Sequence, residues 1–422
     1  MTQLKIRNFG PITEGYKDSD DGFFDVNNLT VFIGEQGAGK SCVAKLFSTL
    51  SWLEKKVAQN PDERVFLEVF ENECLNFHKI KDFLKADTEI VYKGAYCTFT
   101  YKDGIFTIAK GMSENDYTQP KILYIPAERV FCSSVTNPAK VNFLPPNLLS
   151  FMSDYYDALN NSEKNSVMLP LNGYEVVFDK KTNEVFVADK DKDYKIKLES
   201  SSSGLQSLIP LYITLKFFNE QISRPLEERF NEFSLEQTNR IKEFGKELLS
   251  SKRISEEGLN NTLESMKKSL KELWDKAPDI RDKQIKRIID SRMVCIIEEP
   301  EQNLFPESQY IIINELISNM LKDESNICFL TTHSPYILET INNCIYAKQI
   351  SSKGIDVSQI LPEEYHISFD NVAAYKISDG KIYSIKEDDI KQINPEEIDK
   401  CSELISDVYT KLADAEYGAK VE

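Results

Sequence analysis

Apolar positions in the first fifty residues follow two kinds of pattern. Alternation of apolar and polar residues over Leu4 to Phe9 predicts a half-buried strand, and the continuous apolar run Leu29 to Ile33 predicts a strand buried on both faces. The apolar steps between Val43 and Leu50 have helical spacing. The chain therefore begins with strands that lead into a helix.

Further along, β-rich runs occur at 89–110 and at 173–197, each around a polar turn. Together they predict one small antiparallel sheet lobe. A buried strand is expected at Ile122 to Ile125. A helix is expected over 206–221, directly after a cluster of serines.

Residues 224–290 follow a different sequence pattern, with apolar residues in a 4-3-4-3 spacing from Leu259 to Leu273. This spacing predicts an antiparallel helical hairpin, a short coiled coil, with its tip near 250–255. The hairpin divides the chain into an N-terminal part (1–223), the insertion itself (224–290) and a C-terminal part (291–422).

The C-terminal part alternates between strand-like and helix-like runs, which predicts a parallel sheet covered by helices. A hairpin over Val372 to Ile385, turning at Asp379-Gly380, and a helix over 395–412 follow. The alternating runs are 293–297, 310–321, 327–330, 336–341 and 345–350. The fold class is therefore α/β: a parallel-sheet lobe, a small antiparallel β lobe and a short helical insertion.

Charge and composition narrow the range of possible functions. With 51 Lys and Arg against 68 Asp and Glu, the 422 residues carry a net charge of −17, which argues against a protein that coats nucleic acid by bulk charge. With only three histidines in its sequence, the chain has few candidate ligands for a His-based zinc site. The eight scattered cysteines predict buried free thiols, and the first residues lack the apolar core of a signal peptide. We expect a cytoplasmic protein without a membrane partner.

The strand at 29–33 runs into Gly34-Glu35-Gln36-Gly37-Ala38-Gly39-Lys40-Ser41-Cys42, which contains the Walker A pattern G-x-x-x-x-G-K-[ST]. Its glycines let backbone N–H groups close around phosphates, Lys40 reaches the β/γ oxygens, and the Ser41 hydroxyl holds Mg²⁺. The simpler alternative is a Gly-rich turn between a strand and a helix. The flanking elements favour the phosphate-binding reading.

The strand at 293–297 ends in two adjacent carboxylates, Glu298 and Glu299. Successive residues at a strand end point in opposite directions, so one can face a metal and the other an attacking water. We expect Glu298 in the magnesium shell and Glu299 as the base that orients water. An acidic strand end without a Walker A motif would be read as the start of a solvated loop.

His333 follows the next buried strand, in Thr331-Thr-His-Ser-Pro335. It is therefore expected at the carboxyl edge of the sheet, where α/β proteins bind ligands, and an imidazole there can contact a γ-phosphate. His78 and His366 have no such context and are read as structural.

The serine cluster at 200–203 with Gly204 offers hydroxyls and free N–H groups at a helix start, either as an anion site or as an ordinary helix cap. Arg129, after the strand at 122–125, is interpreted either as a phosphate or Q-loop-region contact or as a surface or interface ion pair.

The order of these motifs resembles ABC-type ATPase heads of the SMC, RecF and RecN kind, and most of all the compact AAA-family ATPases of prokaryotic anti-phage defence, such as the AriA subunit of PARIS and the PtuA subunit of Septu. The resemblance implies that Gly34 to Ser41 bind ATP and Mg²⁺ and that His333 is a switch histidine. It also implies that Ser202, Ser203, Gly204 and Gln206 close over ATP held by a second subunit. Glu298, where many ABC proteins have Asp, and Leu205, where the signature has glycine, depart from the family pattern.

Three functions follow from this resemblance. The first is an ATP-gated homodimer that senses a phage trigger protein and controls a separate effector, such as a Toprim-like nuclease. The second is a RecF-like repair ATPase that clamps DNA, which the acidic charge disfavours. The third is a nuclease within the chain, like the OLD family. It is disfavoured because no Toprim-like glutamate with a spaced Asp-x-Asp pair is evident after His333, and Asp388-Asp389 is most simply a solvated turn.

Overall fold

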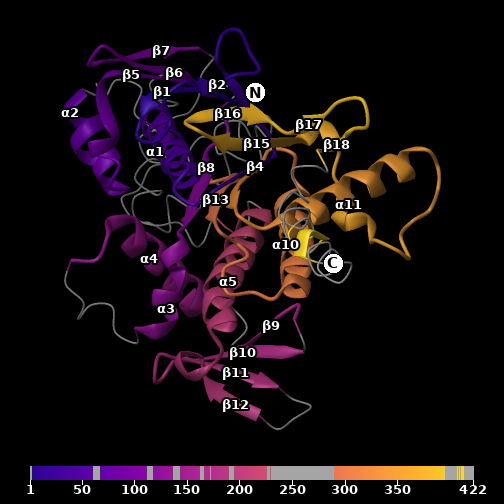
Figure 1. The fold of residues 1–422 in the computed structure, drawn as a ribbon. Helices are drawn as coiled ribbons and strands as arrows, with labels where there is room; N and C mark the ends of the chain where they lie inside the picture. The colour runs from indigo at the N-terminus through magenta and orange to yellow at the C-terminus, as the bar shows by residue number, and fades with distance from the viewer. Residues whose placement is uncertain are drawn as a thin grey trace, which may run out of the picture.

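The computed structural model describes residues 2–59, 67–111, 117–135, 143–161, 166–171, 173–189, 194–225, 229, 289–394, 406, 408 and 410–412. The predicted helical hairpin and most of the predicted helix at 395–412 lie outside these residues. Within the described part the fold is mixed α/β, with a central, largely parallel sheet between two layers (Figure 1).

Seven strands form the central sheet in the order β2-β16-β15-β4-β14-β13-β8, and the run from β15 to β8 is parallel. This sheet combines strands from before and after the segment 224–290. The strands are β2 (Gly15–Tyr16), β4 (Leu29–Gly34), β8 (Pro120–Ile125), β13 (Arg292–Glu298), β14 (Ile327–Thr332), β15 (Val372–Ser378) and β16 (Lys381–Ser384). Because β4, β8, β13 and β14 are parallel, the loops that follow them share one edge of the sheet.

The antiparallel β lobe of the prediction is two separate sheets. One has the order β3-β1-β5-β6-β7 and contains β1 (Thr2–Phe9), β3 (Phe24–Val26), β5 (Leu84–Lys93), β6 (Cys97–Lys102) and β7 (Ile105–Lys110). The other has the order β12-β11-β10-β9 and contains β9 (Ser166–Met168), β10 (Tyr174–Asp179), β11 (Glu184–Asp189) and β12 (Tyr194–Lys197). The prediction of a single lobe was wrong, because the strands from 89–110 and those from 173–197 pair in different sheets, which lie on different sides of the central sheet (Figure 1).

Helices cover both faces of the central sheet. The α-helices among the described residues are α1 (Lys40–Gln59), α2 (Leu67–Val69), α3 (Phe131–Ser134), α4 (Pro146–Asn161), α5 (Ser203–Ser223), α10 (Pro306–Met320) and α11 (Pro335–Ser352). The run at 345–350, expected as a separate element, is the second half of α11. The hairpin of β15 and β16 turns at Asp379-Gly380 as predicted, and β17 (Lys386–Glu387) pairs with β18 (Gln392–Ile393) beyond it.

The central strands are apolar throughout because they contribute to two cores. In β13, Val294 and Ile296 pack toward α1 and the five-stranded sheet, while Cys295 and Ile297 pack toward α4, α5, α10 and α11. On the α1 side, the ring of Phe329 in β14 stacks on the ring of Phe47, with the ring centroids 5.0 Å apart. These contacts hold α1 against β13 and β14. All seven cysteines among the described residues are free and buried, as predicted.

Candidate functional site

The loop between β4 and α1 depends on its glycines. Gly37 and Gly39 have φ of 81° and 117°, which L side chains rarely adopt. A Cβ on Gly34 would lie 2.5 Å from the carbonyl oxygen of Ile377, so only glycine fits there. The backbone therefore curves tightly between Gly34 and Lys40, as a loop that surrounds phosphates must.

The side chain of Lys40 turns back over this loop. Its Nζ donates to the carbonyl oxygens of Gly34 at 2.7 Å and Glu35 at 3.0 Å, and lies 3.3 Å from Nδ1 of His333. Burial lowers the pKa of Lys40, while the nearby carboxylates of Glu299 and Glu301 act in the opposite direction. The amine is thus held at the opening of the loop, facing the end of β14.

Ser41 and Glu298 form the second element of the site. The Ser41 hydroxyl donates to Oε2 of Glu298 at 3.2 Å, and the hydroxyl of Tyr124 donates to Oε1 of the same carboxylate. Glu298 is only 3% exposed, and burial raises its pKa against the opposing effects of Lys45 and these hydrogen bonds. Tyr124 was not among the residues predicted for the site.

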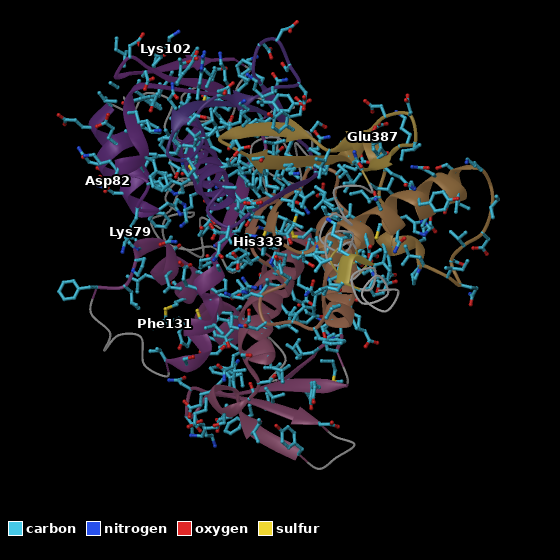
Figure 2. The ribbon with its side chains drawn as sticks, in the orientation of Figure 1. Lys79, Asp82, Lys102, Phe131, His333 and Glu387 are labelled. Carbon is cyan, nitrogen blue, oxygen red and sulfur yellow. The ribbon has the colours of Figure 1, made fainter. Side chains whose placement is uncertain are left out.

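Glu299 faces away from Glu298, as expected for successive residues at a strand end. Its Oε1 lies 3.5 Å from Nε2 of His333, and both side chains are 35% exposed. Glu299 has φ of 45°, a conformation that costs free energy in a non-glycine residue and that clusters at functional sites. His333 therefore lies between Glu299 and Lys40, at the carboxyl edge of the parallel sheet. Figure 2 labels His333 near the middle of the molecule.

Glu301, which was not predicted for this role, holds the His333 loop. Its Oε1 accepts from the backbone N–H of His333 at 2.7 Å and from the hydroxyl of Thr332 at 2.9 Å. Its Oε2 is shielded and has no hydrogen-bond partner in the described part of the chain, and burial raises the pKa of Glu301. Behind it, the hydroxyl of Ser334 donates to Gln309 at 2.6 Å, so α10 also supports the loop.

Arg129 is buried, so the predicted surface ion pair is wrong. It is 0% exposed, and its hydrogen bonds among the described residues go to the backbone carbonyls of Pro126, Ser207, Glu298 and Glu299. Burial lowers its pKa to about 10, against the three glutamates near it. Arg129 thus connects the first turns of α5 to the end of β13.

The serine cluster caps α5. Ser202 is the N-cap and accepts a hydrogen bond from the N–H of Leu205, while Gln206 Nε2 donates to the carbonyls of Glu199 and Ser201. Ser202 and Ser203 are exposed, and among the described residues neither forms a hydrogen bond with Lys40 or Ser41. A Cβ on Gly204 would lie 2.8 Å from the carbonyl oxygen of Asn303, so the cluster packs against the loop after β13.

The remaining predicted residues divide by exposure. Glu35 and Gln36 are exposed on the loop, and Ala38 is half-buried. Cys42 is 4% exposed with its thiol against the carbonyl of Phe9, and burial raises its pKa to about 12. Its side chain therefore belongs to the core, and only its backbone N–H can face a phosphate. Asp388 and Asp389 are exposed in the turn between β17 and β18, as expected.

No protein-family model and no curated protein matches the chain. Among solved structures it is similar to the SMC head domain from Thermotoga maritima, with a TM-score of 0.36 and 10% sequence identity, over 91% of this chain and 97% of that chain. No helix among the described residues is long and apolar enough to cross a membrane. The chemistry of the site therefore follows from its own geometry.

Proposed function

We propose that this protein binds and hydrolyses ATP with Mg²⁺, as an ABC-type ATPase. The observation that carries the proposal is that Lys40, Ser41, Glu298, Glu299 and His333, from three different strand ends, meet at one sheet edge within hydrogen-bonding or ion-pairing distance. A phosphate loop, a hydroxyl beside a carboxylate, and a second carboxylate beside an imidazole are the groups that phosphoryl transfer to water requires.

The donor set suits magnesium. Ser41 offers a hydroxyl oxygen and Glu298 a carboxylate oxygen, and these two atoms lie 3.2 Å apart. In the described part of the chain, no group of three or more His, Cys, Asp or Glu side chains is placed to hold a metal ion without further ligands. Mg²⁺ typically takes one or two protein oxygens, waters and substrate phosphates. When bound, the ion neutralises charge on the transferred phosphoryl group. Ser41 and Glu298 would hold it, and Tyr124 would orient Glu298.

The protein groups divide the work of hydrolysis. Backbone N–H groups between Gly34 and Ser41 bind the phosphates, and the ammonium of Lys40 neutralises them. Glu299 orients the attacking water and accepts its proton as the P–O bond to ADP breaks. His333 contacts both Lys40 and Glu299, so it can respond to the charge at the γ position.

Two variants separate binding from hydrolysis. Lys40→Ala is expected to abolish binding of a fluorescent ATP analogue, and Glu299→Gln to bind it normally but lower the hydrolysis rate about 100-fold or more. The exposed Lys353 and Glu307 supply matched controls, Lys353→Ala and Glu307→Gln, which should behave as wild type. Wild-type hydrolysis by Glu299→Gln would refute the assignment of the base.

The proposal also includes dimerisation of the protein around ATP. Ser202 and Ser203 are exposed at the start of the 21-residue helix α5, whose N-terminal dipole favours an anion, and this supports a second subunit's ATP as their ligand. ATP should convert Glu299→Gln from monomer to dimer in light scattering. Ser203→Arg should block that conversion while retaining ATP binding. A Ser203→Arg protein that still dimerises with ATP would argue against this role.

We also propose that closing of the dimer controls a separate effector protein in anti-phage defence and responds to a phage trigger protein. The motif order and the acidic charge of −17, which favours a protein partner over DNA, support this role. Co-expression with a neighbouring nuclease gene should give an effector whose activity depends on ATP. Salt-dependent, ATP-dependent duplex binding at micromolar affinity or better would favour the DNA-clamp alternative instead.

A further inference from the structure

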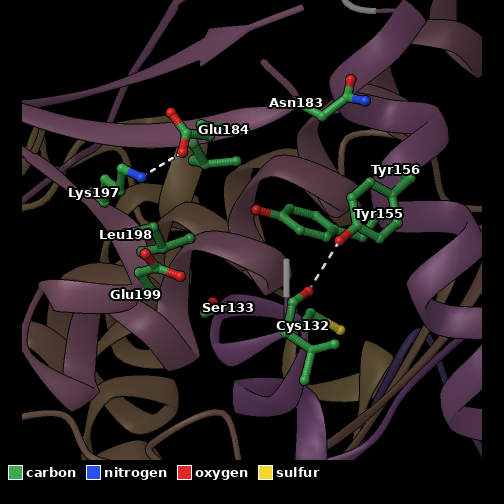
Figure 3. A pocket seen from close by; sticks show the side chains of 11 residues that line it. Cys132, Ser133, Tyr155, Tyr156, Asn183, Glu184, Lys197, Leu198 and Glu199 are labelled. Carbon is green, nitrogen blue, oxygen red and sulfur yellow. Dashed lines mark hydrogen bonds and ion pairs between the residues drawn. The ribbon is translucent and has the colours of Figure 1, made fainter. Parts of the chain in front are cut away.

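A cavity of about 310 Å³ lies between α1, β8 and the start of α4, on the other side of Tyr124 from Glu298. Its fourth wall is the one-turn π-helical segment η1 (Phe70–Leu75) and the residues up to His78. This volume is at the lower end of the range for small-molecule sites. A second cavity, beside Tyr155 between α3, α4 and β11, measures only about 40 Å³ (Figure 3), enough for a water but not for a ligand.

Several aromatic rings line the larger cavity, which we name the α1–β8 cavity. Trp52 and Phe77, which are 45% and 36% exposed, line it together with Tyr124, which is 7% exposed. The ring of His78 packs edge-on against Tyr124 with centroids 4.4 Å apart. Rings of this kind bind a flat apolar ligand by stacking and edge-to-face contact.

The polar groups of the cavity are mostly uncharged. Ser48, Thr49 and Ser150 contribute hydroxyls, and Glu73, exposed at the rim, is the single charged side chain among the described lining residues. His78 is 3% exposed, its Nε2 lies 3.2 Å from the Ser48 hydroxyl, and burial lowers its pKa to about 3. A buried charge without a counter-charge is costly, so this lining selects a neutral ligand with a hydrogen-bonding group.

Tyr124 joins the cavity to the proposed metal site. Its ring lines the cavity, while its hydroxyl donates to Oε1 of Glu298, whose Oε2 accepts from Ser41. A ligand that displaces the Tyr124 ring also moves the donor that orients Glu298. We propose that the α1–β8 cavity is a regulatory site for an uncharged aromatic small molecule, and that its occupancy changes the rate of ATP hydrolysis through Tyr124. The regulatory half of this proposal rests on the proposed function.

Binding is tested without nucleotide by the fluorescence of Trp52. The chain has two tryptophans, so Trp274→Phe leaves Trp52 as the reporter in the full-length protein. Phenethyl alcohol, phenethylamine and hydrocinnamate present the same ring as a neutral, a cationic and an anionic probe. We expect a saturable change with phenethyl alcohol and at least about tenfold weaker binding of the two ions, a difference of about 1.4 kcal/mol.

A variant at the rim locates the binding. Ser150→Phe places a ring over the opening and should weaken binding of phenethyl alcohol about tenfold or more. Ser153→Phe, at an exposed position of α4 that does not line the cavity, is the matched control and should leave it unchanged. No saturable signal, equal binding by Ser150→Phe, or an ion that binds as tightly as the alcohol would overturn the site or its ligand class.

Coupling is tested by hydrolysis with and without phenethyl alcohol. The wild-type rate should change about twofold or more on saturation. Tyr124→Phe should keep the fluorescence response while its own rate no longer depends on the probe. A wild-type rate unaffected by a bound probe would refute the coupling. Because the fluorescence arm contains no nucleotide, its result stands even if the protein hydrolyses no ATP.

Discussion

The hydroxyl of Tyr124 donates a hydrogen bond to Oε1 of Glu298, on the side of that carboxylate opposite Ser41. Both residues are buried, since Tyr124 is 7% exposed and Glu298 is 3% exposed. The carboxylate is thereby fixed with one oxygen on a structural donor and the other beside the hydroxyl of the phosphate loop. Residues that orient a metal ligand in this way commonly tune metal affinity.

Tyr124→Phe should weaken magnesium binding without blocking ATP binding. The variant removes one hydrogen bond to Glu298 and keeps the ring, so the fold should persist. We expect the magnesium concentration for half-maximal hydrolysis to rise about 10- to 100-fold. Tyr155→Phe is the matched control, because the buried hydroxyl of Tyr155 has no hydrogen-bond partner among the described residues. An unchanged magnesium dependence in Tyr124→Phe would show that the hydrogen bond does not serve the metal.

Glu301→Ala should lower the hydrolysis rate by releasing the His333 loop. The carboxylate accepts from His333 N–H and from the Thr332 hydroxyl, so its loss lets the imidazole move away from Glu299. Displacement of a positioned group costs about 10- to 100-fold in rate. Glu301→Gln retains an oxygen that can accept both hydrogen bonds and should recover most of the rate. Equal rates in the two variants would argue against a positioning role.

The parts of the site that could be predicted from the sequence are those whose chemistry is local. Each of these residues lies at or directly after the end of a buried strand: Gly34 to Ser41, Glu298, Glu299 and His333. Because the strands are parallel, their carboxyl ends lie at the same edge of the sheet. The same reasoning gave the parallel sheet and the β15–β16 hairpin.

Tyr124 and Glu301 could not be found in this way because their roles depend on contacts between distant segments. Tyr124 pairs in register with Ile296, two residues before Glu298 on the same face of β13, and nothing local in the sequence indicates that β8 lies beside β13. Likewise, the two groups of β-rich runs give no sign that they join different sheets.

Arg129→Lys should lower kcat for ATP hydrolysis more than it changes KM. The guanidinium holds the carbonyls of Glu298 and Glu299 together with that of Ser207, and a lysine cannot reproduce this fork. Within the described part of the chain Arg129 forms no hydrogen bond with the loop from Gly34 to Ser41, so ATP binding should be nearly unchanged. Arg7→Lys, at an exposed position of β1, is the control. A rise in KM with kcat preserved would contradict this prediction.

Arg129→Met tests the energetic role of the same residue. It leaves several buried carbonyls without donors, at about 1–3 kcal/mol for each. The variant should therefore unfold at clearly lower urea concentration than Arg129→Lys. Equal stability of the two variants would mean that other groups or water satisfy these carbonyls.

His78 should make the folded protein sensitive to acid. Burial, with a smaller contribution from Lys45, lowers its pKa from 6.5 to about 3. Above pH 6.5 the imidazole is neutral in both the folded and the unfolded chain, so its contribution to stability is fully present. As the pH falls from 6.5 toward 3, the unfolded chain takes up a proton that the folded chain cannot, and the free energy of unfolding decreases by up to about 1.4 kcal/mol per pH unit.

His78→Gln removes this titration and keeps a polar group that can bond to Ser48. Urea unfolding of the two proteins over a series of pH values measures the difference in their free energies of unfolding, which cancels the titration of all other groups. Above pH 6.5 the difference should be constant. Below that value the wild type should lose stability faster than His78→Gln. A difference that stays constant down to pH 4 would mean that the folded protein accommodates the charged imidazole, for instance by opening the α1–β8 cavity to water.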